Sequence, residues 1–160
     1  MILINLGTKK RNMVMKMGTG RLKHIITLDE ILLERFSKNK IESVIKKVYP
    51  QIVKDLGGNA KNVEVHNNIW DRLGAVGVED LKKEQGNPDA QYDPYDNKIY
   101  LYSEKMLTDE DIIRSLLHEH THTLQDQKKF KKLYDEGYQY DNHPFEIEAT
   151  KAEKNWKKYI

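Results

Sequence analysis

The chain has 160 residues, of which 38% are hydrophobic and 32% charged, a balance that suits one soluble domain with a buried core. Its net charge is only +2, which is too small to indicate nucleic acid as a partner. The absence of cysteine excludes disulfides, thiolate metal sites and a cysteine nucleophile.

The sequence also gives an expectation about location. No stretch is long and apolar enough to cross a bilayer, and the apolar start, residues 1–7, is too short for a signal peptide. We therefore expect no membrane partner and a cytoplasmic location. A virion location is the alternative that fits the same sequence.

The first third of the chain predicts an arm and a long helix. Residues 1–26 show no clear periodicity, and we expect an extended N-terminal arm there. A helix should begin at the capping box Thr27–Glu30 and continue with an apolar stripe of helical period to Gly57. Pro50 should kink this helix or divide it into two.

The middle of the chain predicts two strands separated by loop. Residues 62–66 alternate between polar and apolar side chains, as a strand does, and the lone His66 at their end is expected at the surface. Residues 67–97 are rich in turn-forming residues, so we expect mostly loop, with a short helix at Val78–Lys83. After the turn at Asp93–Asp96, residues 97–102 alternate again and predict the second strand.

A helix that starts at about residue 109 carries the most informative motif. Thr108 is a suitable N-cap, and no glycine or proline interrupts the chain until Gly137, where a helix should end. The motif is His118-Glu119-His120-Thr121-His122. At about 100° per residue, His118 and His122 lie about 40° apart on the face opposite the apolar stripe, and His120 lies within the stripe.

This arrangement is typical of zinc hydrolases. Two imidazoles on one face of a helix can hold a metal, and the adjacent glutamate can act as general base. We therefore expect His118 and His122 to be metal ligands, Glu119 to be the base, and His120 to be buried with a hydrogen-bond partner. The alternative is that the motif is accidental on an amphipathic helix, in which case no metal binds.

A second helix should supply the third metal ligand. It is expected to run from Pro144 to about Tyr159, with Asn142 or His143 as its cap. Near its start it carries two glutamates, Glu146 and Glu148. A glutamate added to two histidines makes a three-ligand zinc site that leaves a fourth position for water.

These motifs resemble the gluzincin class of zinc metallopeptidases, and most of all its smallest members, the minigluzincins. In that class the third ligand is a glutamate with an alanine three positions later, which is met here by Glu146 with Ala149 and not by Glu148. The sequence departs from the pattern at His120, where many relatives have an apolar residue, and at Thr150, where many have Asp or Asn.

The resemblance implies a fold. We expect a zincin-like α+β single domain over residues 1–160, with backing helices, a small mixed sheet, the HExxH helix and a C-terminal glutamate helix. It also implies that the strand at residues 97–102 forms the rim of the cleft and pairs with substrate. An alternative role for the arm at residues 1–26, known in minigluzincins, is to lie across the cleft and block it.

The function implied by the resemblance is a zinc-dependent metalloendopeptidase that acts on a peptide or protein substrate. Zn²⁺ would be held by His118, His122 and Glu146, and Glu119 would activate a zinc-bound water. The alternative is a zinc-binding, non-proteolytic structural or assembly protein, such as a phage particle component, that retains the fold.

Two further expectations concern the surroundings of the motif. The basic run Lys128–Lys132 is expected to be a solvated face at the end of the helix that carries His118 and His122, here called the metal helix, rather than a binding patch. An oxyanion needs a hydrogen-bond donor opposite the metal. The candidates for that donor are Tyr134, Tyr138, Tyr140 and His143.

Overall fold

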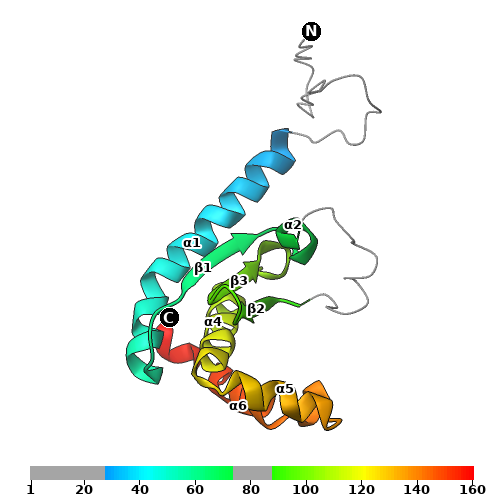
Figure 1. The fold of residues 1–160 in the computed structure, drawn as a ribbon. Helices are drawn as coiled ribbons and strands as arrows, with labels where there is room; N and C mark the ends of the chain where they lie inside the picture. Colours follow the sequence, from blue (N-terminus) through cyan, green and yellow to red (C-terminus); the bar gives the residue numbers. More distant parts are fainter. Residues whose placement is uncertain (1–27, 74–87) are drawn as a thin grey trace, which may run out of the picture. The chain divides into compact units, whose positions relative to one another are not determined.

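The computed structural model describes residues 28–73 and 88–160 (Figure 1). Within these ranges the chain is α+β, with five α-helices and one three-stranded mixed sheet. In the described part of the chain, no helix is long and apolar enough to cross a membrane. The predicted arm at residues 1–26, the cap Thr27 and the predicted helix Val78–Lys83 lie outside the described residues.

The long N-terminal helix α1 spans Leu28–Leu56 without a break at Pro50. Of the two predicted effects of Pro50, a kink or a division, the division is therefore wrong. Val48 and Ile52, on either side of Pro50, are at most 3% exposed. Their burial offsets the roughly 3 kcal/mol that an interior proline costs a helix. At the C-terminus of α1, Gly57 adopts a φ of 85°, which favours glycine.

The chain divides into two units within α1, at Lys40 and Ile41. Of the first unit, the structure describes only the helical residues from Leu28 onward. The second unit, Ile41–Ile160, contains the sheet and the remaining helices. The expectation of a single domain over residues 1–160 stays a prediction.

The sheet has the order β1-β3-β2, with β1 at Asn62–His66, β2 at Ala90–Asp93 and β3 at Lys98–Tyr102. β1 is parallel to β3, and β2 is antiparallel to it across the predicted turn. Both strands expected from the sequence are present. The region expected to be loop contains two short elements in addition, β2 and the helix α2 at Ile69–Leu73.

The central strand β3 is covered on both faces. Ile99 and Leu101 point into the main core, which is shared with the second half of α1, with β1 and with the helix α4 at Asp109–Leu124. Tyr100 and Tyr102 point to the other face and pack under α2. β3 also has a strand on each side, whereas β2 is an edge strand among the described residues.

The C-terminal half forms three helices. α4 begins with the predicted cap, because Thr108 and Asp111 make a reciprocal capping box. The helix stops at Leu124, and a separate helix α5 occupies Gln127–Asp135, so the uninterrupted run predicted up to Gly137 is wrong. The Asp126 side chain accepts hydrogen bonds from the first backbone N–H groups of α5 and so caps a new helix.

The last α-helix, α6, spans Pro144–Glu153 and packs against α4. As predicted, His143 is its N-cap, and its side chain accepts a hydrogen bond from the backbone N–H of Phe145. The helix is shorter than predicted, because Trp156–Tyr159 forms a 3-10 turn. This packing places the first turn of α6 beside the polar face of α4.

Candidate metal centre

The polar face of α4 presents the two histidines of the motif. Leu116 and Leu117 are fully buried in the core on one side of the helix. His118 and His122 lie on the other side and are each 8% exposed. The helix is thus held by its apolar stripe, and this fixes the direction in which the two imidazoles point.

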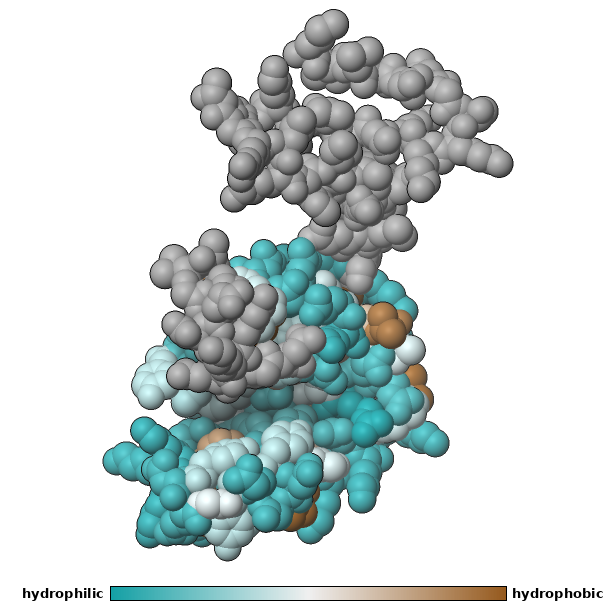
Figure 2. Space-filling view, turned by 90° about the vertical axis from the view of Figure 1, so that its right-hand side faces the viewer, coloured by the Kyte–Doolittle hydropathy of each residue, from teal (hydrophilic) through white to brown (hydrophobic). Residues whose placement is uncertain are grey.

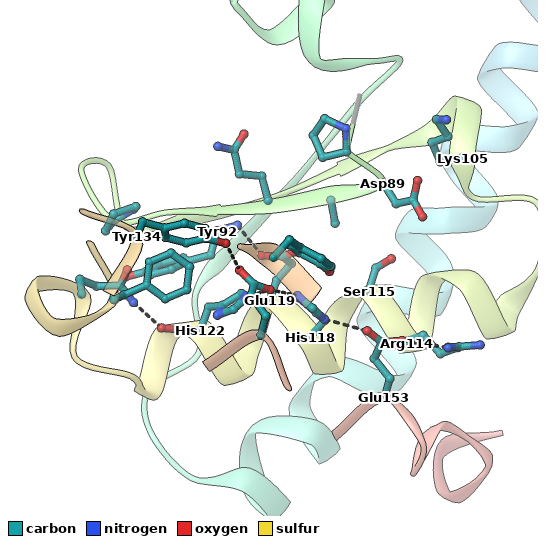
Figure 3. A pocket seen from close by; sticks show the side chains of 18 of the residues that line it. Asp89, Tyr92, Lys105, Arg114, Ser115, His118, Glu119, His122, Tyr134 and Glu153 are labelled. Atoms are coloured by element: carbon teal, nitrogen blue, oxygen red, sulfur yellow. Dashed lines mark hydrogen bonds and ion pairs between the residues drawn. The ribbon is translucent and has the colours of Figure 1, made fainter. Parts of the chain in front are cut away.

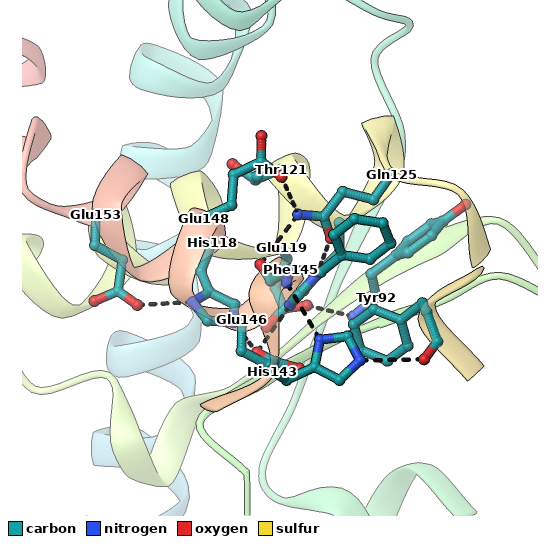
Figure 4. A network of polar contacts seen from close by, with 12 residues as sticks. Tyr92, His118, Glu119, Thr121, Gln125, His143, Phe145, Glu146, Glu148 and Glu153 are labelled. Atoms are coloured by element: carbon teal, nitrogen blue, oxygen red, sulfur yellow. Dashed lines mark hydrogen bonds and ion pairs between the residues drawn. The ribbon is translucent and has the colours of Figure 1, made fainter. Parts of the chain in front are cut away.

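Glu146, from the first turn of α6, meets these imidazoles (Figure 4). Its Oε2 lies 3.2 Å from Nε2 of His118 and 3.3 Å from Nε2 of His122. Two ligand atoms that share a tetrahedral zinc at 2.0–2.1 Å lie about 3.3 Å apart. The spacing of these atoms therefore suits a metal ion, and His118, His122 and Glu146 are the one such group in the described part of the chain.

The Oε2 atom of Glu146 makes no hydrogen bond of acceptable geometry, although it is buried. Every other buried side-chain nitrogen or oxygen among the described residues has a partner. The second oxygen of the same carboxylate accepts a hydrogen bond from the Tyr134 hydroxyl at 3.2 Å. An unpartnered buried carboxylate oxygen is costly, and a cation bound at this point would remove that cost.

The carboxylates around the centre favour a bound positive charge. Burial by itself would lower the pKa of His118, but Glu146 and Glu153 raise it to about 10. Burial would raise the pKa of Glu146, but His118 and His122 lower it to about 2. A proton on His118 thus supplies the positive charge that the carboxylates require. A divalent cation held by the three side chains would supply it instead.

Both histidines have a second contact that orients the ring. Nδ1 of His118 lies 2.7 Å from Oε1 of Glu153, and Nδ1 of His122 lies 2.8 Å from Oε1 of Gln125. An acceptor at Nδ1 keeps the proton there and leaves the Nε2 lone pair for a metal. Arg114 on α4 donates to the same Glu153 carboxylate and fixes it in turn.

Sequence reasoning missed Glu153 and Gln125, although a signal was present. Glu153 follows Glu146 by two helical turns and so shares its face of α6. Gln125 follows His122 by one turn at the end of α4. Thr150, where the sequence departs from the gluzincin pattern, is exposed. Glu153 thus provides the carboxylate contact that Thr150 does not.

Removing the Glu153 carboxylate should weaken metal binding without abolishing it. We expect Glu153→Ala to lower zinc affinity by about 10- to 100-fold, as loss of an outer carboxylate typically does. Competition against a chromophoric chelator measures this change. Glu110→Ala is the matched control, because Glu110 also pairs with Arg114 but contacts neither histidine. Equal affinity in Glu153→Ala and the parent would contradict the assignment.

Glu119 lies beside the three side chains and points into a cleft (Figure 3). Its Oε2 accepts a hydrogen bond of 2.6 Å from the backbone N–H of Tyr92 on β2. Burial raises the pKa of Glu119, and His122 and His118 partly oppose this rise. A carboxylate whose pKa is shifted toward neutrality is suited to accept and return a proton.

The strand β2 is held from its far side by Arg72 of α2. The Arg72 guanidinium donates to the side chains of Gln91 and Asp93, the residues on either side of Tyr92. The same guanidinium lies 3.7 Å from the centre of the Tyr100 ring. Arg72 therefore anchors the strand that contacts Glu119.

The cleft has a volume of about 1220 Å³ and is bounded by β2 and the turn after it, by α4 and by α5. Figure 2 shows it as a groove across this face of the molecule. The expectation that the strand at residues 97–102 forms the rim is wrong, because β3 is paired on both sides. The edge strand β2 takes that place, and Gln91 and Tyr92 line the cleft.

The other histidines in the described part of the chain lie outside the group of three. His120 is fully buried and contacts the Tyr49 hydroxyl at 3.1 Å and the Gly57 carbonyl at 2.9 Å, which confirms the prediction of a buried, partnered histidine. His143 is also fully buried, and its Nε2 contacts the Phe130 carbonyl. His66 is partly exposed and lies near Glu64, away from the centre.

The remaining candidates divide by their position relative to the cleft. Of the four residues considered as oxyanion donors, Tyr134 and Tyr140 line the cleft, whereas Tyr138 and His143 do not. Glu148 is exposed, and it accepts a hydrogen bond from the side chain of Gln125. It is therefore separated from the three converging side chains by Gln125.

Comparison with known proteins identifies no relative of this chain. No protein-family model matches the chain, and searches of curated proteins and of solved structures return no significant match.

Proposed function

We propose that this protein is a zinc-dependent metallopeptidase with a gluzincin-like site. The observation that carries the proposal is the convergence of His118, His122 and the unpartnered Oε2 of Glu146 on one point. Beside that point a further carboxylate, Glu119, faces an open cleft. The resemblance in sequence motif and this geometry support the same reaction.

The ligands suit zinc and leave room for substrate. Zinc in hydrolytic sites takes three nitrogen and oxygen ligands and keeps a fourth position open. When bound, zinc lowers the pKa of a coordinated water and polarises the scissile carbonyl. A set of two histidines and one carboxylate also suits Fe(II). Glu119 favours hydrolysis, because a base beside the open position serves to remove a proton from water.

Glu119 is assigned the role of general base. The Tyr92 N–H holds its Oε2 and so orients the carboxylate toward the cleft. Glu119 would accept a proton from the attacking water and deliver it to the leaving amine. Its pKa, raised by burial, makes both transfers easier than they would be for an exposed glutamate.

The cleft offers contacts for an extended peptide. β2 is an edge strand of four residues among the described residues, and the backbone groups on its outer edge, other than the Tyr92 N–H held by Glu119, can pair with the backbone of a substrate. Tyr134 and Tyr140 lie on the other wall, and because the Tyr134 hydroxyl already donates to Glu146, Tyr140 is the candidate donor to substrate. Burial, with Glu146 next in order, raises the pKa of Tyr140 to about 12 and raises that of Tyr134 as well, so both remain protonated donors.

The test is a digest of a peptide library by the zinc-loaded protein. We expect internal cleavage that stops when 1,10-phenanthroline removes the metal and returns when zinc is restored. A protein that binds zinc but cleaves no peptide would contradict the peptidase proposal. That result would instead support a zinc-binding structural or assembly protein.

A further inference from the structure

The four lysines of the run Lys128–Lys132 differ in where they point. Lys128 and Lys131 line the cleft, whereas Lys129 and Lys132 do not. Residues three apart share one face of a helix, so α5 turns one pair of lysines toward the cleft and the other pair away. The run belongs to this separate helix rather than to the end of the metal helix.

The lysines outside the cleft already have partners. Lys132 pairs with Glu136 at 3.5 Å, and Lys129 lies 5.8 Å from the centre of the Phe145 ring. Among residues 28–73 and 88–160, no acidic side chain forms an ion pair with Lys128 or Lys131. Two positive charges therefore line the cleft without an ion-pair partner among the described residues, although the same cleft also contains the carboxylates of the candidate centre.

The two ends of the cleft differ in charge. At the end beside α5, Lys128 and Lys131 stand with uncharged residues of the opposite wall, namely Tyr92, Pro94 and Tyr95. Figure 3 shows Tyr92 and Tyr134 together at this end, and Asp89, Lys105 and Arg114 toward the other. There the charges are mixed, and Arg114 is paired with Glu110 and Glu153. The arginine at that end is thus neutralised within the chain, whereas Lys128 and Lys131 at the α5 end have no ion-pair partner among the described residues.

The direction of β2 indicates which part of a bound peptide would lie beside Lys128 and Lys131. The strand runs from Ala90 toward Asp93, that is, toward the α5 end (Figure 3). Antiparallel pairs are more stable than parallel ones. A peptide paired antiparallel to β2 would place the residues N-terminal to its scissile bond beside α5.

We propose that Lys128 and Lys131 select acidic side chains on the N-terminal side of the scissile bond. This inference rests on the proposed peptidase function, because it assigns a substrate preference to the same cleft. Both lysines are exposed, so each ion pair with a substrate is modest and weakens with salt. We expect a preference of about threefold to tenfold for acidic over neutral residues at low ionic strength.

Two double variants test the proposal in peptide-library digests. Lys128→Glu/Lys131→Glu reverses the charge inside the cleft, and Lys129→Glu/Lys132→Glu reverses the same charge on the other face of α5. Each changes the net charge by four, from +2 to −2. We expect the preference for Asp and Glu to disappear in the first variant and to persist in the second. A preference that is absent from the parent, or equal in both variants, would overturn the inference.

A binding measurement separates this result from the peptidase proposal. In a Glu119→Gln background, fluorescence anisotropy would compare two labelled alanine-based peptides that differ only in carrying glutamates or lysines near the N-terminus. Tighter binding of the glutamate peptide that is lost with Lys128→Glu/Lys131→Glu supports the inference, whether or not the parent cleaves. Equal binding of the two peptides contradicts it, even if cleavage is observed.

Discussion

Glu119→Gln is expected to keep zinc at the affinity of the parent and to cleave peptides about two to four orders of magnitude more slowly. The amide has the shape of the carboxylate and can still accept the hydrogen bond from the Tyr92 N–H. It cannot accept a proton from water at neutral pH. The variant therefore separates general-base function from metal binding and from the position of β2.

The measurement is the rate of cleavage of one quenched fluorescent peptide by zinc-loaded proteins. Glu110→Gln is the control, because Glu110 lies on the same helix but outside the cleft lining. It should cleave at the parental rate. Parental activity in Glu119→Gln would show that another group takes the proton and would remove the main role assigned to this residue.

The second large effect is expected when Glu146, the proposed third ligand, is replaced, and it is a loss of zinc affinity. Glu146→Ala should weaken zinc binding by more than the 10- to 100-fold attributed to outer contacts, because it removes an atom that would touch the metal. Glu148→Ala changes the neighbouring glutamate of the same helix, which is exposed and outside the group of three. It should leave zinc binding close to that of the parent.

Thermal unfolding reports the same difference. A ligand that binds only the folded chain stabilises it by about 2.7 kcal/mol at a concentration of 100 times its dissociation constant. Added zinc should therefore raise the Tm of the parent and of Glu148→Ala, but not that of Glu146→Ala. A zinc-dependent rise in Glu146→Ala as large as that of the parent would mean that Glu146 is not a ligand.

The parts of the fold that follow from local chemistry could be predicted. The capping box at Thr108, the His143 cap before Pro144 and the left-handed glycine at Gly57 each depend on residues close in sequence. The direction of His118 and His122 follows equally from helical periodicity.

The sequence-based predictions were wrong where core packing, or a cap that was not recognised, determines the limits of a helix or the position of a strand. Pro50 stays inside a helix because Val48 and Ile52 are held in the core, which no local rule reports. The break before α5 needs neither glycine nor proline, since Asp126 alone supplies a cap. β2 is too short for its pattern to be recognised, yet it forms the rim of the cleft, the place that the resemblance assigned to β3.

The candidate centre shows the same division. The spacing of His118 and His122 was enough to predict them as metal ligands. The choice of Glu146 over Glu148 as the third ligand depended on the resemblance, because both glutamates lie in the first turns of one helix. The structure brings Glu146 to the histidines and leaves Glu148 exposed. Glu153 and Gln125 depend on how α6 packs against α4, so their contacts with the histidines could not be read from the motif.

The central claim is that His118, His122 and Glu146 bind one metal ion. Equilibrium dialysis of the purified protein against Zn²⁺, with the metal counted by atomic emission, tests it most directly. We expect one zinc per chain in the parent and none retained by His118→Ala/His122→Ala at the same free zinc concentration. No bound zinc in the parent, or one zinc per chain in both proteins, would contradict it.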